Sequence, residues 1–247
     1  MISSLIFAIG LCVGSFLNVV IFRLNKKPGI LLGRSECPHC GHILKWRDLV
    51  PILSFLILKR RCRYCRQKIS LIYPAVEAIA AISFMAYFYF RNSYQILAVY
   101  DLVLISGLLV ILFSDLLEFT IPDKIVFPLI ILAFTFNLTA SDLSGRLTTA
   151  LIIGLIFAII YLVSQGRWIG LGDAKLVFLM GLALSYPLGA LAVLLSVWTA
   201  ALVGIALVAT KKATFKTALP LGTFLAASSI IFIIFQNELQ KITQTIF

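Results

Sequence analysis

The stretch ILAVYDLVLISGLLVILFSD, residues 96–115, is almost entirely apolar and is long enough to cross a bilayer. A membrane-spanning α-helix needs about 20 predominantly apolar residues. Two acids interrupt the stretch, Asp101 inside it and Asp115 at its end. Charged groups are costly in such a place and need a reason. The stretch therefore predicts a membrane helix, and its acids are candidate functional residues.

The rest of the chain has the same character. Of its 247 residues, 61% are hydrophobic and only 13% are charged, and the mean hydropathy is +1.06. A soluble domain of this length needs more polar surface to cover one core. The composition therefore predicts an all-α, polytopic membrane protein.

Eight apolar segments are predicted to span the membrane. The first is expected to be a retained helix and not a cleaved signal peptide, because no basic residue precedes it and no small-residue cleavage site follows it. Their ranges are 2–22, 72–90, 96–113, 125–138, 149–164, 174–187, 189–209 and 218–235. We expect three parts: a first transmembrane helix at 1–24, a basic loop at 25–70, and a seven-helix membrane core at 71–247.

The basic residues predict the orientation. Twelve of the 21 Lys and Arg residues lie between Arg23 and Ser70, where only Glu36 and Asp48 oppose them. Positively charged loops stay on the cytoplasmic side, so this loop is expected inside and both termini outside. The other inside loops would hold six further basic residues, and the outside regions would hold three. This topology and anionic lipid headgroups explain the net charge of +11 without a nucleic acid partner.

One part of the basic loop is apolar. The segment LVPILSFLIL, residues 49–58, is too short to span a bilayer as a helix. It is expected to lie at the membrane interface or to pack against the helices.

Four cysteines in the same loop predict a metal site. Cys37 and Cys40 form one C-x-x-C pair, Cys62 and Cys65 form another, and 21 residues separate the pairs. Two such pairs are typical of a tetrahedral structural zinc site, although the separation is slightly above the usual range. Free reduced thiols or a redox pair are the alternatives. His39 and His42 are expected outside the ligand shell, because four thiolates complete it.

Two aspartates are the candidates for catalysis. Asp115 ends the third predicted span and Asp173 begins the sixth, so the topology brings both to the cytoplasmic face. Two carboxylates that share a site can hold one proton between them. One of them then activates water as a general base while the other protonates a scissile carbonyl. The alternative is that both are ordinary helix-end charges, and Asp173 suits a helix N-terminus.

Other polar residues are weaker candidates, with structural roles as the alternative. Gly170 and Gly172 allow a close backbone approach before Asp173, and Lys175 is expected to favour the charged form of that aspartate. Asp123 is expected to cap the next helix. The remaining candidates are Asn18, which needs a hydrogen-bond partner in the first span, and the intramembrane acids Glu77 and Asp101.

Together, these strings resemble the prepilin peptidases, also called type IV leader peptidases. Six segments match in the expected order: GSFLNVVIFRL at 14–24, SECPHCGH at 35–42, RCRYC at 61–65, YPAVE at 73–77, Asp115 with Ile121-Pro122-Asp123, and GLGDAK at 170–175. The resemblance covers nearly the whole chain.

The resemblance implies a membrane aspartic peptidase of the bacterial cytoplasmic membrane. Its catalytic pair would be Asp115 and Asp173, with Asp123 as an alternative to Asp115. The substrates would be prepilins or pseudopilins, cut after a glycine just before their apolar helix. Many members with the cysteine loop also N-methylate the new N-terminus with S-adenosylmethionine, and both activities are expected here. A proton-coupled transporter and a non-catalytic membrane assembly protein are the alternatives from other classes.

Overall fold

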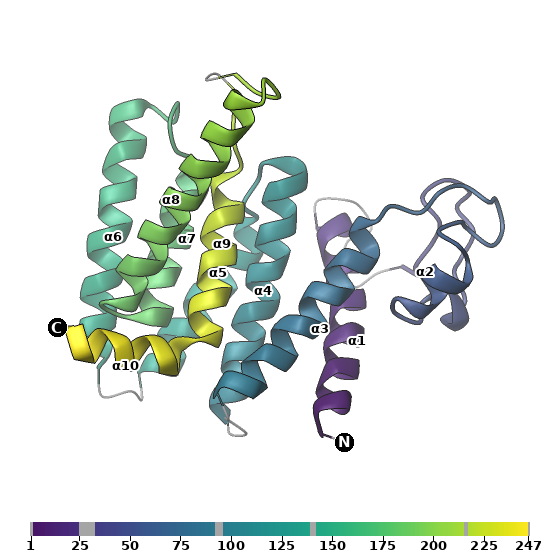
Figure 1. Cartoon of the computed structure of the whole chain (residues 1–247), viewed down its shortest axis with the longest axis horizontal. Coiled ribbons are helices and arrows are strands. Elements are labelled where there is room, and N and C mark those ends of the chain that lie inside the picture. Colours follow the sequence, from purple (N-terminus) through teal and green to yellow (C-terminus); the bar gives the residue numbers. More distant parts are fainter. Residues whose placement is uncertain (1, 25–32, 92–95, 139–141, 215–216, 247) are drawn as a thin grey trace. The chain divides into compact units, whose positions relative to one another are not determined.

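The computed structural model describes residues 2–24, 33–91, 96–138, 142–214 and 217–246 (Figure 1). These residues form helices, turns and two isolated β-bridges, with no extended strand among them. The chain divides into two compact units, Met1–Tyr89 and Phe90–Phe247. The prediction of an all-α protein is confirmed.

The first unit is built on two long helices, α1 (Ile2–Arg23) and α3 (Ile72–Arg91, which ends just inside the second unit). The 3₁₀ turn η1 (Trp46–Asp48) and the short helix α2 (Leu53–Ile57) lie in the segment between them.

Two glycines bring α1 and α3 together. A Cβ added to Gly10 would lie 2.6 Å from the Cα of Ala81, and one added to Gly14 would lie 2.6 Å from the Cα of Glu77. Small residues four apart let two membrane helices approach this closely. Farther along α1, Asn18 donates a 3.0 Å hydrogen bond from Nδ2 to the Tyr73 carbonyl.

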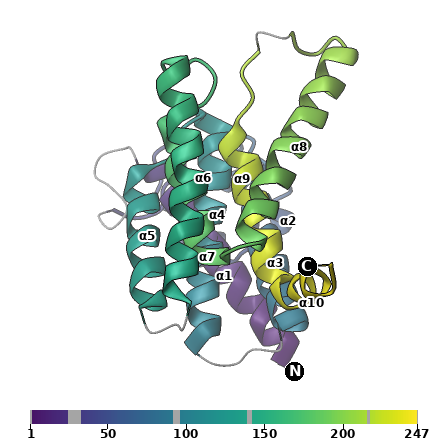
Figure 2. The same ribbon diagram turned by 90° about the vertical axis from the view of Figure 1, so that its left-hand side faces the viewer.

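The second unit contains seven helices among its described residues. They are α4 (Ile96–Glu118), α5 (Asp123–Asn137), α6 (Leu143–Ser164), α7 (Leu171–Leu184), α8 (Leu188–Ala209), α9 (Leu221–Ile234) and α10 (Gln236–Ile246). The first six run alternately in opposite directions, and α7 and α9 occupy the middle of the unit (Figure 2). The end of α4 and the starts of α7 and α9 therefore meet at one end of the unit.

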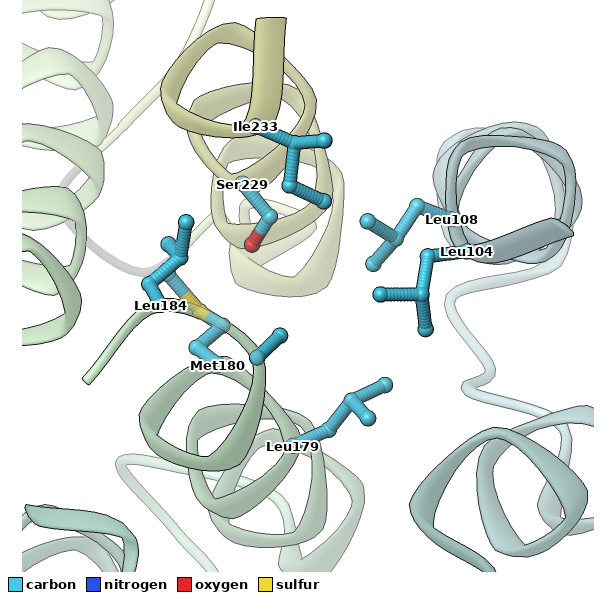
Figure 3. Close-up of a pocket in the computed structure, with 8 residues that line it drawn as sticks. Leu104, Leu108, Leu179, Met180, Leu184, Ser229 and Ile233 are labelled. Carbon is cyan, nitrogen blue, oxygen red and sulfur yellow. The ribbon is translucent and has the colours of Figure 1, made fainter. Parts of the chain in front are cut away.

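The interior between α4, α7 and α9 is apolar and closely packed. Leu104, Leu108, Leu179 and Met180 converge there with Ser229 (Figure 3). The cavity among them is only about 10 Å³, which is at the lower limit for one water molecule.

The outer helices of this unit expose large apolar side chains. On α6, Leu162 and Val163 are 70% and 73% exposed, and on α8, Trp198 and Ile205 are 62% and 64% exposed. Such continuous apolar faces are typical of a surface that contacts lipid.

Every predicted span corresponds to a helix, but the helices differ in length. Within the described part of the chain, five helices are long and apolar enough to cross a membrane: α1, α3, α4, α6 and α8. A sixth crossing is possible if α9 and α10, bent by 81°, count as one. The other two, α5 and α7, have 15 and 14 residues, about 21–23 Å at 1.5 Å per residue. Hydropathy cannot distinguish such a short helix from a full span because both are continuous apolar runs.

Candidate active site and metal centre

Asp115 lies in the last turn of α4, where it is only 5% exposed. Its Oδ2 accepts a 2.7 Å hydrogen bond from the Thr223 backbone N–H and a 3.2 Å bond from the Thr223 hydroxyl. Thr223 is the third residue of α9, and the first N–H groups of a helix have no partner within it. Asp115 of one helix therefore caps the N-terminus of another.

Asp173 caps the N-terminus of its own helix. It lies in the first turn of α7, is 8% exposed, and accepts a 2.9 Å hydrogen bond at Oδ2 from the Gly170 N–H. Gly170 has extended backbone angles and is the residue just before the helix. A carboxylate in the first turn is favoured there by the helix dipole.

Ile121 fills the space between α7 and α9. A Cβ added to Gly172 would lie 2.9 Å from the Cβ of Ile121, and one added to Gly222 would lie 2.6 Å from its Cδ1. The Gly222 Cβ would also lie 3.0 Å from the Asp115 Cγ. Glycine at both positions thus lets the Ile121 segment, α7 and α9 close together around the aspartates.

Asp115 and Asp173 are thereby brought together, each at a helix N-terminus. A charge on Asp115 opposes a charge on Asp173. Helix N-termini stabilise negative charge, whereas burial and mutual repulsion oppose a second one. Such a pair is suited to hold a single proton and to act on a bound carbonyl and a water molecule.

Asp123 is placed differently from Asp115. Its carboxylate is 55% exposed and forms a 2.7 Å ion pair with the Lys175 Nζ, which also lies 5.0 Å from the ring centre of Phe127. The direct partner of Lys175 is thus Asp123, and its expected effect on Asp173 stays a prediction. Asp123 projects from the first turn of α5 toward α7, so it attracts the lysine.

The other intramembrane acids have structural partners. Asp101 forms a 2.9 Å ion pair with Arg91, and both side chains are almost fully buried. Glu77 accepts a 2.8 Å hydrogen bond from the Ile52 N–H. These contacts agree with the structural interpretation of both acids.

The four loop cysteines converge in the first unit. All four Sγ atoms of Cys37, Cys40, Cys62 and Cys65 lie within 4.8 Å of one another, and those of Cys37 and Cys65 are 3.9 Å apart. Tetrahedral zinc with Zn–S bonds of about 2.3 Å needs sulfurs about 3.8 Å apart. The donor set and its spacing therefore fit one zinc ion.

The two cysteine pairs adopt the same local structure. In the first, the Cys37 N–H donates to the His42 carbonyl and Gly41 has a φ of 66°. In the second, the Cys62 N–H donates to the Gln67 carbonyl and Arg66 has a φ of 60°. Each turn places two sulfurs on the same side. His42 instead packs against Tyr64, with ring centres 3.6 Å apart and the rings tilted by 32°, as expected for a residue outside the ligand shell.

Electrostatics favour a thiolate at Cys37 but not at Cys65, where the Gln67 N–H would lower the pKa but burial and the neighbouring thiols raise it to about 11. Burial alone would raise the pKa of Cys37, but hydrogen bonds from the backbone N–H groups of Cys40 and His39 outweigh it and lower the pKa to about 7. Nearby, burial opposes ionisation of Asp48, yet hydrogen bonds from Arg63 and from the Lys45 N–H hold its pKa below the usual value. The Asp48–Arg63 ion pair, at 2.8 Å, ties η1 to the second cysteine turn.

Three residues of the site were not predicted from the sequence: Thr223, Gly222 and Ile121. Each contributes to the site through contact with a residue that is distant in the sequence and is brought close only by the tertiary structure. The string Pro220-Leu221-Gly222-Thr223, a Pro-Gly break at the start of an apolar run, was the available signal.

Two regions of the chain match known families. Residues 102–205 match the Type IV leader peptidase family, and residues 8–90 match the Bacterial Peptidase A24 N-terminal domain. These regions contain both aspartates and all four cysteines of the metal centre.

Full-length relatives agree with these matches. The chain is 34% identical to the prepilin leader peptidase/N-methyltransferase of Bacillus subtilis (strain 168) over 233 residues, 92% of each protein. It is 30% identical to the protein of that name from Pseudomonas putida, over 94% of this chain and 90% of that one. It is 37% identical to the Myxococcus xanthus protein of that name, over 73% of this chain and 56% of that one. No solved structure matches the chain.

The chain is thus a multi-pass membrane protein that belongs to the type IV leader peptidase family.

Proposed function

We propose that this protein is a membrane aspartic endopeptidase that removes the leader from prepilins or pseudopilins. Asp115 and Asp173 would be its catalytic residues. The single observation that supports this most strongly is that these two buried carboxylates, from different helices, meet at the N-termini of α7 and α9. The names of its relatives supply the substrate class.

The hydrogen bonds suggest different roles for the two acids. Asp115 accepts two hydrogen bonds from Thr223, and bonds to a carboxylate favour its ionised form. Asp115 is therefore suited to take a proton from the attacking water. Asp173 accepts one from Gly170 and is suited to carry the shared proton to the scissile carbonyl.

The distribution of charge supports an orientation. In the second unit, Lys124, Lys175, Lys211 and Lys212 lie near the same helix ends as the aspartates. The positive-inside rule would place that end, and the cysteine segment, in the cytoplasm. Both termini would lie outside, in a bacterial cytoplasmic membrane. Lys26, Lys27 and Lys216 add to the inside charge but lie outside the described residues.

The relatives' names also support a second activity, N-methylation of the new N-terminus. S-adenosylmethionine is the methyl donor that we propose, and we assign no residues to it. Zinc held by the four cysteines would fix the shape of the segment at 33–70 without taking part in peptide cleavage.

The two alternative functions fit the site less well. A proton relay needs acids spread across the bilayer, whereas Asp115 and Asp173 lie together at one end and Asp101 is paired with Arg91. A non-catalytic assembly protein does not need two acids buried in one site.

The test is an assay of the purified chain with a synthetic prepilin peptide, with and without S-adenosylmethionine, in which product masses are read. We expect cleavage after the leader glycine in both cases, and a further gain of one methyl group, about 14 Da, only with the donor. An intact peptide under both conditions would refute the peptidase assignment. Cleavage without a methyl gain would refute the second activity alone.

A further inference from the structure

The short helix α2 exposes an apolar face that the peptidase chemistry does not explain. Leu53, Leu56 and Ile57 lie three and four residues apart and so share one face of the helix. They are 57%, 63% and 74% exposed. Trp46 of η1, which contacts α2, is 72% exposed. We call these four residues the α2 face.

Positive charge surrounds the α2 face. Two basic residues, Lys45 and Arg47, flank Trp46, and three more follow α2 directly: Lys59, Arg60 and Arg61. The one acid within this stretch, Asp48, is already paired with Arg63. The combination of exposed apolar side chains with a basic rim is complementary to an anionic bilayer surface.

A partly buried hydrogen bond fixes the height of α2 along the membrane helix. The Ile52 N–H, just before α2, donates to the Oε2 of Glu77 at 2.8 Å. Glu77 is the sixth residue of α3, so it lies about 7.5 Å along the axis from the start of that helix. Ile52 has a φ of 58°, which a β-branched residue rarely adopts, so α2 is held here against a backbone cost.

That height matches the membrane interface. With 20 residues, α3 is about 30 Å long, close to the thickness of the hydrocarbon core. A point 7.5 Å in from its start therefore lies about 7.5 Å below the boundary between headgroups and acyl chains, within the roughly 5–10 Å to which the apolar face of an interfacial helix is buried. Tryptophan is favoured at this boundary, and leucine and isoleucine are favoured just below it.

We propose that the α2 face inserts into the interface of an anionic membrane leaflet and thereby docks the cysteine segment on the bilayer. Lys45, Arg47 and the basic residues after α2 would contact lipid phosphates. Glu77 and Ile52 would hold the segment at the correct depth. The proposal does not depend on the peptidase assignment.

Trp46 provides a direct test in the full chain. Substituting Trp168→Phe and Trp198→Phe leaves it as the sole tryptophan. The protein is reconstituted in nanodiscs of phosphatidylcholine with or without phosphatidylglycerol. Fluorescence quenching by lipids brominated near the headgroup is compared with quenching by acrylamide in water. We expect strong quenching by the brominated lipid, weak quenching by acrylamide, and a loss of lipid quenching when phosphatidylglycerol is omitted.

A variant then tests whether the apolar face is responsible. Leu56→Ser with Ile57→Ser should remove most of the lipid quenching and raise the acrylamide quenching. Ile43→Ser, the same kind of change at a residue of the first cysteine turn that is 49% exposed, should change neither. Acrylamide quenching that is strong in both lipid compositions would overturn the proposal. Shielding of Trp46 from both quenchers would also overturn it, because the α2 face would then be covered by protein.

Discussion

Thr223 binds Asp115 through two donors on the same residue, its backbone N–H and its hydroxyl. The backbone bond survives any substitution except proline, so the hydroxyl can be removed alone. A hydrogen bond to a charged group contributes about 1.5–3 kcal/mol, and 1.4 kcal/mol corresponds to a factor of ten in rate.

We therefore expect Thr223→Val to lower kcat for prepilin cleavage about tenfold or more, with little change in KM. Steady-state kinetics on the synthetic peptide would measure this. Thr199→Val is the matched control, because the Thr199 hydroxyl bonds only carbonyls of its own helix, α8. Equal kinetics for the two variants would remove Thr223 from the site.

Asp48 links η1 to the second cysteine turn through Arg63, Tyr64 and the Lys45 N–H. Because the folded protein lowers its pKa, the ionised form stabilises the fold. This contribution is complete above the unfolded pKa of about 3.9 and is lost as the pH falls through the lower, folded value.

Asp48→Asn should therefore speed hydrogen exchange across residues 45–66, corresponding to a loss of about 1–2 kcal/mol, since Arg63 is half exposed. The effect should be equally large at pH 7 and pH 5. Glu36→Gln, at the other acid of the segment, should have no such effect. A difference that disappears between pH 7 and pH 5 would show that another group is responsible.

Some of these residues could be predicted from the sequence and some could not. An acid at the end of an apolar run is costly, so Asp115 and Asp173 were conspicuous. A threonine inside an apolar run is ordinary, because its hydroxyl can bond its own helix. The role of Thr223 becomes visible only when α4 packs against α9. The pairing of Lys175 with Asp123 likewise becomes visible only when α5 packs against α7.

At the scale of elements, the site depends on how closely α7 and α9 approach the Ile121 segment. Gly222 lies against both Ile121 and Asp115, so a methyl group there has no room. Overpacking of this kind typically costs about 1–3 kcal/mol.

Gly222→Ala is expected to displace Asp115 and to lower kcat by at least about tenfold. Adding Ile121→Ala should recover part of the activity, because it removes the nearest atoms, Cδ1 and Cγ1. Cleavage rates of the two single variants and the double variant test this coupling. Strictly additive losses would contradict it.

The cysteine segment should depend on its metal. The purified protein is expected to contain about one zinc ion per chain, since a four-thiolate site binds one. Cys62→Ser should lose the metal and expose residues 33–70 to proteolysis, because the segment has few apolar residues with which to form a core of its own. Cys12→Ser, at an exposed cysteine of α1 outside the cluster, should retain the metal. Elemental analysis without zinc in the wild-type protein would refute the site.

Helices were easier to predict than their ends or their surroundings. The eight apolar runs each correspond to a helix because hydropathy marks them directly. The helix α10 was missed, because Gln236–Ile246 is amphipathic and has no continuous apolar run. The hydrogen bond that fixes α2 to α3 through Glu77 was also beyond prediction, since it joins residues 25 positions apart.

At the scale of the whole molecule, the composition already required a lipid environment, and the exposed faces of α6 and α8 agree with it. The composition did not predict how many helices cross the whole bilayer. Short helices such as α7 are shielded by longer neighbours, so they need not match the bilayer thickness.

The proposed peptidase activity requires Asp115 and Asp173 to act as one catalytic pair. The most direct measurement is the rate of prepilin cleavage by purified Asp115→Asn, Asp173→Asn and Glu118→Gln proteins, with Asp123→Asn alongside. We predict no detectable cleavage for Asp115→Asn and Asp173→Asn. Glu118→Gln, at an exposed acid of the same helix end, should cleave at a normal rate. Asp123→Asn should show reduced but measurable cleavage. Normal processing by either Asp115→Asn or Asp173→Asn would show that the two aspartates are not a catalytic pair.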